Sequence, residues 1–142
     1  MTFENKIKIL YQEFPSSLSK EERYLKILSF SKYIDPFLNE AFTDAHLVHG
    51  CQSVTYISSY IDGGNIFFKA KSDALITKGL VGVLFFLFNG ETPERILQFN
   101  DTLFNELQIF SSLSPNRSNG LSQMILHCKK LSLHLILQNS HQ

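Results

Sequence analysis

The sequence predicts a single α+β domain in which a small antiparallel β-sheet is covered by helices. Apolar residues recur at helical spacing before residue 35 and again after residue 72. Between these regions, a stretch of β-branched and aromatic residues is interrupted by a Gly-Gly turn. The 142 residues, 44% of them hydrophobic, suffice for one core and are too few for two. Because no repeat or interdomain linker is visible, we expect one domain over residues 1–142.

Two helices are predicted at the N-terminus. The first follows a Thr2 cap, and its apolar face is Phe3, Ile7, Leu10 and Phe14. The second opens at Ser19, with Glu22 three residues later in a capping-box pattern, and is expected to end near Ile34. The stretch 35–50 has little periodicity and is expected to be mainly loop.

A β-hairpin is predicted next. β-branched and aromatic side chains favour a strand from Val54 to Tyr60. The turn residues Asp62-Gly63-Gly64-Asn65 follow, and the chain returns over Ile66 to Lys71.

Helices are predicted for the remainder of the chain. Ser72 and Asp73 are expected to cap a helix whose body is apolar on almost every side and which ends at Asn89-Gly90. Another helix starts at Thr92-Pro93-Glu94.

The C-terminal third is expected to hold a short helix, a loop and a long helix. The short helix is predicted near Thr102 to Leu107. A polar loop from Ser111 to Asn119 is then expected to lead into a final helix from about Gly120 to Leu137.

Charge and hydropathy exclude several classes of protein. Lysine plus arginine and aspartate plus glutamate both number 13, so the chain lacks the positive excess of a nucleic-acid binder. The most apolar run, Gly79 to Phe88, is too short to cross a bilayer, and no secretory leader is visible. We therefore expect a cytoplasmic protein with two reduced thiols, no membrane contact and no nucleic-acid partner.

The two cysteines have different settings. Cys51 lies in HGCQS, between a predicted loop and the first strand, where Gly50 and Ser53 leave little bulk around a thiol that another molecule must reach. The alternative is a buried cysteine that serves only as a small hydrophobic residue. Cys128 falls on an apolar helical stripe and is predicted to be structural. The stripe comprises Leu121, Met124, Ile125, Cys128, Leu131 and Leu135.

Other chemistry is weakly indicated. Two cysteines and five histidines show no CxxC or HxxxH spacing, so no metal site is predicted. His46 and His49 flank the Cys51 loop, but surface histidines are commoner than catalytic ones. Arg117 is a lone arginine in the polar loop, where a solvated side chain or a helix-cap contact is the simpler interpretation.

Three blocks of the sequence resemble the SufE family. They are VHGCQS (Val48 to Ser53), SDALITKGLVGVLFFLFNGETPERI (Ser72 to Ile96) and LSPNRSNGL (Leu113 to Leu121). EERYLKIL (Glu21 to Leu28) resembles the family's second helix, so the resemblance covers about residues 17 to 135. Tyr56 stands where the family usually has tryptophan, and Asn105 to Phe110 follows the family only loosely.

The resemblance implies a sulfur-relay protein of iron–sulfur cluster assembly. A SufS-type, pyridoxal-phosphate-dependent cysteine desulfurase would pass persulfide sulfur to Cys51 and be stimulated by the exchange. The chain would relay the sulfur to a scaffold such as the SufBCD complex. It would act as an accessory protein without a cofactor of its own, and the resemblance leaves open whether it forms a homodimer.

Five other residues gain expected roles only from the resemblance, as support for the loop or as partner interface: Gly50, Gln52, Ser53, Asp73 and Arg117. The Cys51 thiolate would be the nucleophile. Because a persulfide exposed to solvent would lose its outer sulfur to small thiols, we also expect Cys51 to be partly sheltered until the desulfurase docks. Two alternatives stay open. One is a regulatory domain that binds a desulfurase and has a structural Cys51; the other is an IscU-type cluster scaffold, which would need several cysteine ligands.

Overall fold

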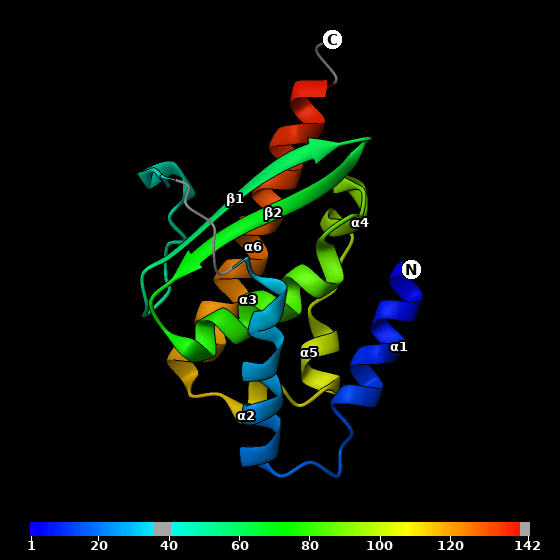
Figure 1. The fold of residues 1–142 in the computed structure, drawn as a ribbon, viewed down its shortest axis with the longest axis vertical. Helices are drawn as coiled ribbons and strands as arrows, with labels where there is room; N and C mark the ends of the chain where they lie inside the picture. The colour runs from blue at the N-terminus through cyan, green and yellow to red at the C-terminus, as the bar shows by residue number, and fades with distance from the viewer. Residues whose placement is uncertain (36–40, 140–142) are drawn as a thin grey trace.

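The structure is a computed structural model that describes residues 1–35 and 41–139. It is an α+β domain, as predicted, with six α-helices, three 3-10 helices and one hairpin among these residues (Figure 1). In chain order the elements are α1 (Phe3–Glu13), α2 (Lys20–Ser29), η1 (Phe30–Tyr33), η2 (Asp44–His46), β1 (Thr55–Asp62), β2 (Asn65–Ser72), α3 (Leu75–Phe88), α4 (Pro93–Leu97), α5 (Thr102–Glu106), η3 (Phe110–Ser112) and α6 (Pro115–Asn139). Part of the predicted 35–50 loop, residues 36–40, and the last three residues of the predicted domain lie outside the described residues.

The N-terminal helices begin at the predicted caps. Thr2 Oγ1 accepts a hydrogen bond from Asn5 N at 3.1 Å at the start of α1. At α2, Glu22 N donates to Ser19 Oγ at 3.0 Å, and Ser19 N donates to Glu22 Oε1 at 2.9 Å. This reciprocal pair satisfies two N–H groups that the helix itself leaves unpaired. Both capping predictions are therefore confirmed.

The sheet is the two-stranded hairpin that the sequence predicts. β1 and β2 pair antiparallel, with Thr55 opposite Ser72 and Asp62 opposite Asn65. Gly63 and Gly64 form the turn with positive φ angles of 61° and 82°, a conformation that favours glycine. Alternate residues of β2 are buried: Ile66, Phe68, Ala70 and Ser72. This face packs on α3, while β1 also contacts α6, so the helices cover one face of the hairpin (Figure 1).

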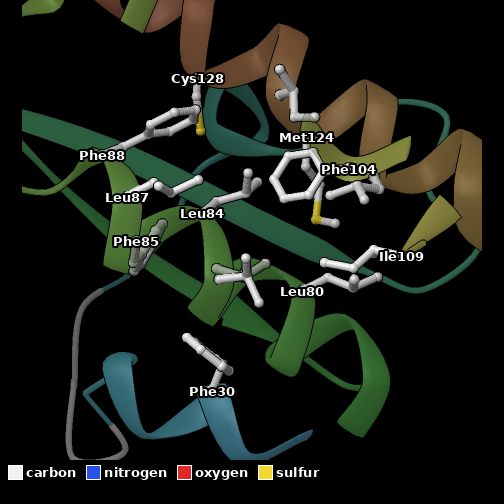
Figure 2. Close-up of a cluster of buried hydrophobic side chains, with 14 of the residues drawn as sticks. Phe30, Leu80, Leu84, Phe85, Leu87, Phe88, Phe104, Ile109, Met124 and Cys128 are labelled. Atoms are coloured by element: carbon white, nitrogen blue, oxygen red, sulfur yellow. The ribbon is translucent and has the colours of Figure 1, made fainter. Parts of the chain in front are cut away.

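Helix α3 forms the centre of the core. Eleven of its fourteen residues are buried, in agreement with the predicted all-round apolar helix. Figure 2 shows Leu80 and Leu84 of α3 between Phe30 on one side and Met124 and Cys128 of α6 on the other. The helix therefore contacts the N-terminal elements, the hairpin and the C-terminal helix at once.

Glycine lets α3 approach the N-terminal elements closely. A Cβ atom added at Gly82 would lie 1.9 Å from the carbonyl oxygen of Phe30, and one at Gly79 would lie 2.5 Å from that of Ile27. Both obstacles are backbone atoms, which cannot rotate away as a side chain does. The contact between α3 and the segment from α2 to η1 thus depends on these two positions having no side chain.

Two predicted helix starts are wrong. The N-cap of α3 is Ala74, without a side-chain cap, because the Ser72 hydroxyl instead pairs with Thr55 Oγ1 at 3.1 Å across the hairpin. The last helix begins at Pro115 rather than near Gly120, because Ser114 Oγ accepts from Arg117 N at 3.3 Å as a cap.

Within residues 1–35 and 41–139, no helix combines the length and the apolar character needed to cross a bilayer.

The close approach at Gly82 leads to a stability prediction. Gly82→Ala should lower the free energy of unfolding by about 1–3 kcal/mol, because the added methyl group must displace the Phe30 backbone. In an unobstructed helix the same substitution stabilises by up to ~1 kcal/mol, so the sign of the effect is diagnostic. Urea denaturation measures the difference.

The control is Leu75→Ala on the same helix, because Leu75 is 72% exposed. It should change the free energy of unfolding by less than ~0.5 kcal/mol. A Gly82→Ala protein as stable as the wild type would contradict the packing described here.

Candidate functional site

Cys51 lies in the loop just before β1 and packs against the first turns of α6. Its thiol donates a weak hydrogen bond to the carbonyl oxygen of Gly120, with Sγ 3.6 Å from the oxygen. Gly120 has no side chain to separate helix and loop, and a Cβ added there would lie 3.6 Å from Sγ. The thiol is half-buried as a result.

A small pocket opens beside this thiol. It is lined by Cys51, Gln52, Ser53, Thr77, Leu80, Asn116, Arg117, Gly120 and Met124. The lining comes from the loop, α3 and α6, three parts of the chain that are far apart in the sequence. The enclosed volume is about 10 Å³, close to the least that holds a single water-sized particle.

Gly50 shapes the loop immediately before Cys51. Its φ angle of 85° is in the left-handed region, which side chains other than glycine rarely adopt. A Cβ there would also lie 2.8 Å from Cγ of Gln123. Asn119 Nδ2 donates to the Gly50 carbonyl oxygen at 3.3 Å and so ties the loop to α6. Gly50 therefore lies at a turn that a larger residue would strain, and its role as loop support stays a prediction.

Arg117 belongs to the first turn of α6 and points to the loop, not to solvent alone. Its Nη1 donates to Thr77 Oγ1 at 3.0 Å and lies 3.4 Å from Ser53 Oγ. The two hydroxyl oxygens are themselves 2.8 Å apart. The sequence placed Arg117 in a loop and offered a solvated side chain as the simpler interpretation; the start of α6 at Pro115 corrects that placement.

Two opposing effects act on ionisation of the Cys51 thiol. Burial raises the pKa of Cys51, because a thiolate loses solvation in the half-buried pocket, and the positive charge of Arg117 lowers it. The first effect is the larger, so the pKa lies above its usual value. Neither His46 nor His49 is among the groups that influence the thiol. His46 instead accepts a hydrogen bond from Thr43 N at 3.3 Å.

Cys128 is a core residue, as its helical stripe predicts. It is fully buried in α6 among the side chains of Figure 2, and burial raises the pKa of its thiol strongly. A thiol that neither meets solvent nor ionises is not a nucleophile.

The remaining predicted site residues are more peripheral. Gln52 is exposed at the mouth of the pocket. Asp73 is also exposed, and its backbone N–H donates to the Val54 carbonyl oxygen at 3.3 Å, so it lies at the base of the same loop.

Thr77 is a polar, buried pocket residue that the sequence reasoning missed. It is buried and contributes a hydroxyl to the contact between Ser53 and Arg117. The available signal was a hydroxyl side chain in the first turn of a helix whose other residues, apart from Lys78, are apolar or glycine.

Potential metal ligands are dispersed. Among residues 1–35 and 41–139, no group of three or more histidine, cysteine, aspartate or glutamate side chains is arranged to hold a metal ion.

Comparison with known proteins identifies the family. Residues 8–132 match the family model described as SufE, the Fe-S metabolism associated domain. The chain belongs to the SufE family. One relative is a protein of Synechocystis sp. (strain PCC 6803) named an uncharacterized SufE-like protein. It is 32% identical to this SufE-family chain over 111 residues. That match covers 78% of this chain and 70% of the relative. Membership associates the chain with iron–sulfur metabolism.

A solved structure supports the fold. The solution structure of a hypothetical protein from Thermus thermophilus matches with a TM-score of 0.77 and 22% sequence identity. The match covers 93% of this chain and 96% of that one. At this identity the likeness shows that the two chains share a fold.

The difference between the thiols leads to a labelling prediction. In the native protein at about pH 7.5, iodoacetamide should modify Cys51 more slowly than it modifies a free cysteine, because burial reduces both access and the thiolate fraction. Raising the pH should accelerate the reaction. The midpoint of the rate against pH should lie above that of free cysteine, because the pKa of Cys51 is raised in the folded protein. Peptide mass spectrometry measures the modification at each site.

Cys128 is the internal control for this experiment. It should remain unmodified in the native protein and react in denaturant, where both thiols become equivalent. Modification of Cys51 at the rate of a free cysteine would refute the sheltering hypothesis.

Proposed function

We propose that this SufE-family chain accepts a persulfide sulfur on Cys51 from a SufS-type cysteine desulfurase and relays it in iron–sulfur cluster assembly. The observation that carries the proposal is a half-buried loop thiol at a small pocket beside a guanidinium group. Family membership supplies the metabolic setting. The chain needs no cofactor for this step, because the desulfurase carries the pyridoxal phosphate.

The transfer step is a thiol exchange. The Cys51 thiolate attacks the outer sulfur of the persulfide on the desulfurase, a new S–S bond forms on Cys51, and the S–S bond of the donor breaks. The donor cysteine leaves as a thiolate and takes up a proton. No electrons are gained or lost overall, so the step needs no oxidant or reductant.

The site has to balance reactivity against protection. At the ordinary pKa of ~8.5, only a few per cent of a cysteine is thiolate near neutral pH. Burial lowers the thiolate fraction of Cys51 further. Ionisation also breaks the hydrogen bond from the thiol to the Gly120 carbonyl oxygen, because the donated proton is lost. The shelter that slows the reaction also keeps small thiols away from a bound persulfide. Docking of the desulfurase would then expose the thiol when transfer is required.

The surrounding residues suggest a division of roles. Arg117 would stabilise the thiolate and the persulfide anion through its charge, with Ser53 holding the guanidinium. Gly50 would fix the turn of the loop. Gln52 and Asp73, both exposed near the loop, would face the docking protein. The sulfur would pass onward to a scaffold such as the SufBCD complex in the cytoplasm.

A regulatory domain that binds a desulfurase without accepting sulfur is the alternative. The observation that favours it is the burial of Cys51, since a half-buried thiol with a raised pKa also suits a structural cysteine. An IscU-type cluster scaffold has no comparable support, since a scaffold needs several ligands and the described residues present no such group.

Sulfur loading tests the proposal directly. After incubation with a SufS-type desulfurase and cysteine, intact mass spectrometry should show a gain of one or more sulfur atoms, mapped to Cys51. Cys51→Ser should abolish the gain, because no other solvent-accessible thiol exists among the described residues. Cys128→Ser, the matched control, should retain most of it.

The same variants separate the proposal from the alternative. Under the sulfur-acceptor mechanism, Cys51→Ser should also fail to stimulate the desulfurase, whereas a regulatory domain would stimulate it without the thiol. A wild-type chain that stays unmodified beside an active cognate desulfurase, or a sulfur gain that maps to Cys128, would show the proposal to be wrong.

A further inference from the structure

Thr77 is an unusual residue for its position. It lies in the first turn of α3, where its neighbours Ile76 and Leu80 are apolar and buried. Its own side chain is only 3% exposed. A buried hydroxyl loses its hydrogen bonds to water and must find partners in the protein.

The partners of Thr77 are both at the Cys51 pocket. An arginine side chain can only donate, so Thr77 Oγ1 accepts from Arg117 Nη1 at 3.0 Å. Thr77 shares a second hydrogen bond with Ser53 Oγ, 2.8 Å away, which also lies 3.4 Å from the same Nη1. Nη1 is therefore shared between two adjacent hydroxyl oxygens, one on α3 and one on the Cys51 loop.

This arrangement fixes the guanidinium from one end. Within the described residues, its hydrogen bonds run from Nη1 alone. Arg117 and Cys51 both line the same small pocket, so the held guanidinium lies at the pocket that contains the thiol. Thr77 belongs to a helix that is held in the core, whereas Ser53 belongs to the more exposed loop before β1, so Thr77 is the firmer anchor.

We propose that Thr77 is a positioning residue for sulfur transfer, which holds the Arg117 guanidinium beside the Cys51 sulfur. This inference rests on the proposed function, but the contact on which it depends is visible in the protein alone. Removal of the hydroxyl lets the guanidinium swing to solvent, and the sulfur anion loses the nearby positive charge. Thr77 itself does not touch the reacting sulfur, so its effect passes through Arg117.

The test uses the full-length protein and the rate of Cys51 alkylation by iodoacetamide as a function of pH. Thr77→Val preserves the shape of the side chain and removes the hydroxyl. It should move the midpoint of the pH profile upward and slow alkylation near neutral pH by about threefold, since the thiolate fraction below the midpoint changes about tenfold per pH unit. Thr77→Ser keeps the hydroxyl and should restore the wild-type profile.

Two further variants separate positioning from general damage to the pocket. Thr55→Val removes another buried hydroxyl, one that bonds Ser53 and Ser72 but not Arg117, and should leave the midpoint unchanged. In an Arg117→Gln background, Thr77→Val should have no further effect on the profile, because the group it positions is absent. Thr77→Ala gives a second hydroxyl-free side chain and should shift the midpoint in the same direction.

The outcomes distinguish this inference from the proposed function. A Thr77→Val protein that folds and has the wild-type alkylation profile overturns the inference, as does an equal shift in the Arg117→Gln background. Neither result affects sulfur loading of wild-type Cys51. Conversely, a wild-type chain that accepts no sulfur refutes the proposed function, while a shifted profile in Thr77→Val would still establish the contact from Thr77 through Arg117 to the thiol.

Discussion

The packing of α3 is the constraint on which the rest of the structure depends. The helix is buried on almost every side, and Gly79 and Gly82 bring it against the carbonyl groups of the N-terminal elements. A helix held this closely cannot shift without disturbing the whole core. Its first turn therefore gives the Cys51 pocket one fixed wall, on which the more exposed loop and the start of α6 are assembled.

The two thiols show how one fold gives the same residue type opposite properties. Cys128 is enclosed by core side chains and is chemically silent, whereas Cys51 is only half-covered and has a cation nearby. The difference comes from secondary structure. Cys128 lies on the packed face of α6, where its side chain has no path to solvent. Cys51 lies in a loop that contacts α6 through two side-chain hydrogen bonds, and its thiol keeps a path to solvent.

Local signals predicted much of the fold, and long-range contacts account for what they missed. The caps at Thr2 and Ser19, the Gly63-Gly64 turn and the apolar α3 are each encoded within a few neighbouring residues. Cys51 was also placed correctly in a loop, yet its sulfur-accepting role stays a proposal. Ser72 failed as a cap because its hydroxyl pairs across the hairpin. Thr77 was overlooked because its partners lie 24 and 40 positions away in the chain, where no spacing rule reaches.

Gly120 determines how much free space lies beside the Cys51 sulfur. A methyl group at this position would sit 3.6 Å from Sγ, an ordinary van der Waals distance, so the folded chain has room for it. That methyl group would nevertheless occupy space at the wall of a chamber of only about 10 Å³. A methyl group at position 120 would thus be tolerated by the fold but would reduce the free space beside the thiol. Under the proposed function, the absence of a side chain at this turn of α6 sets the size of the group that Cys51 can bear.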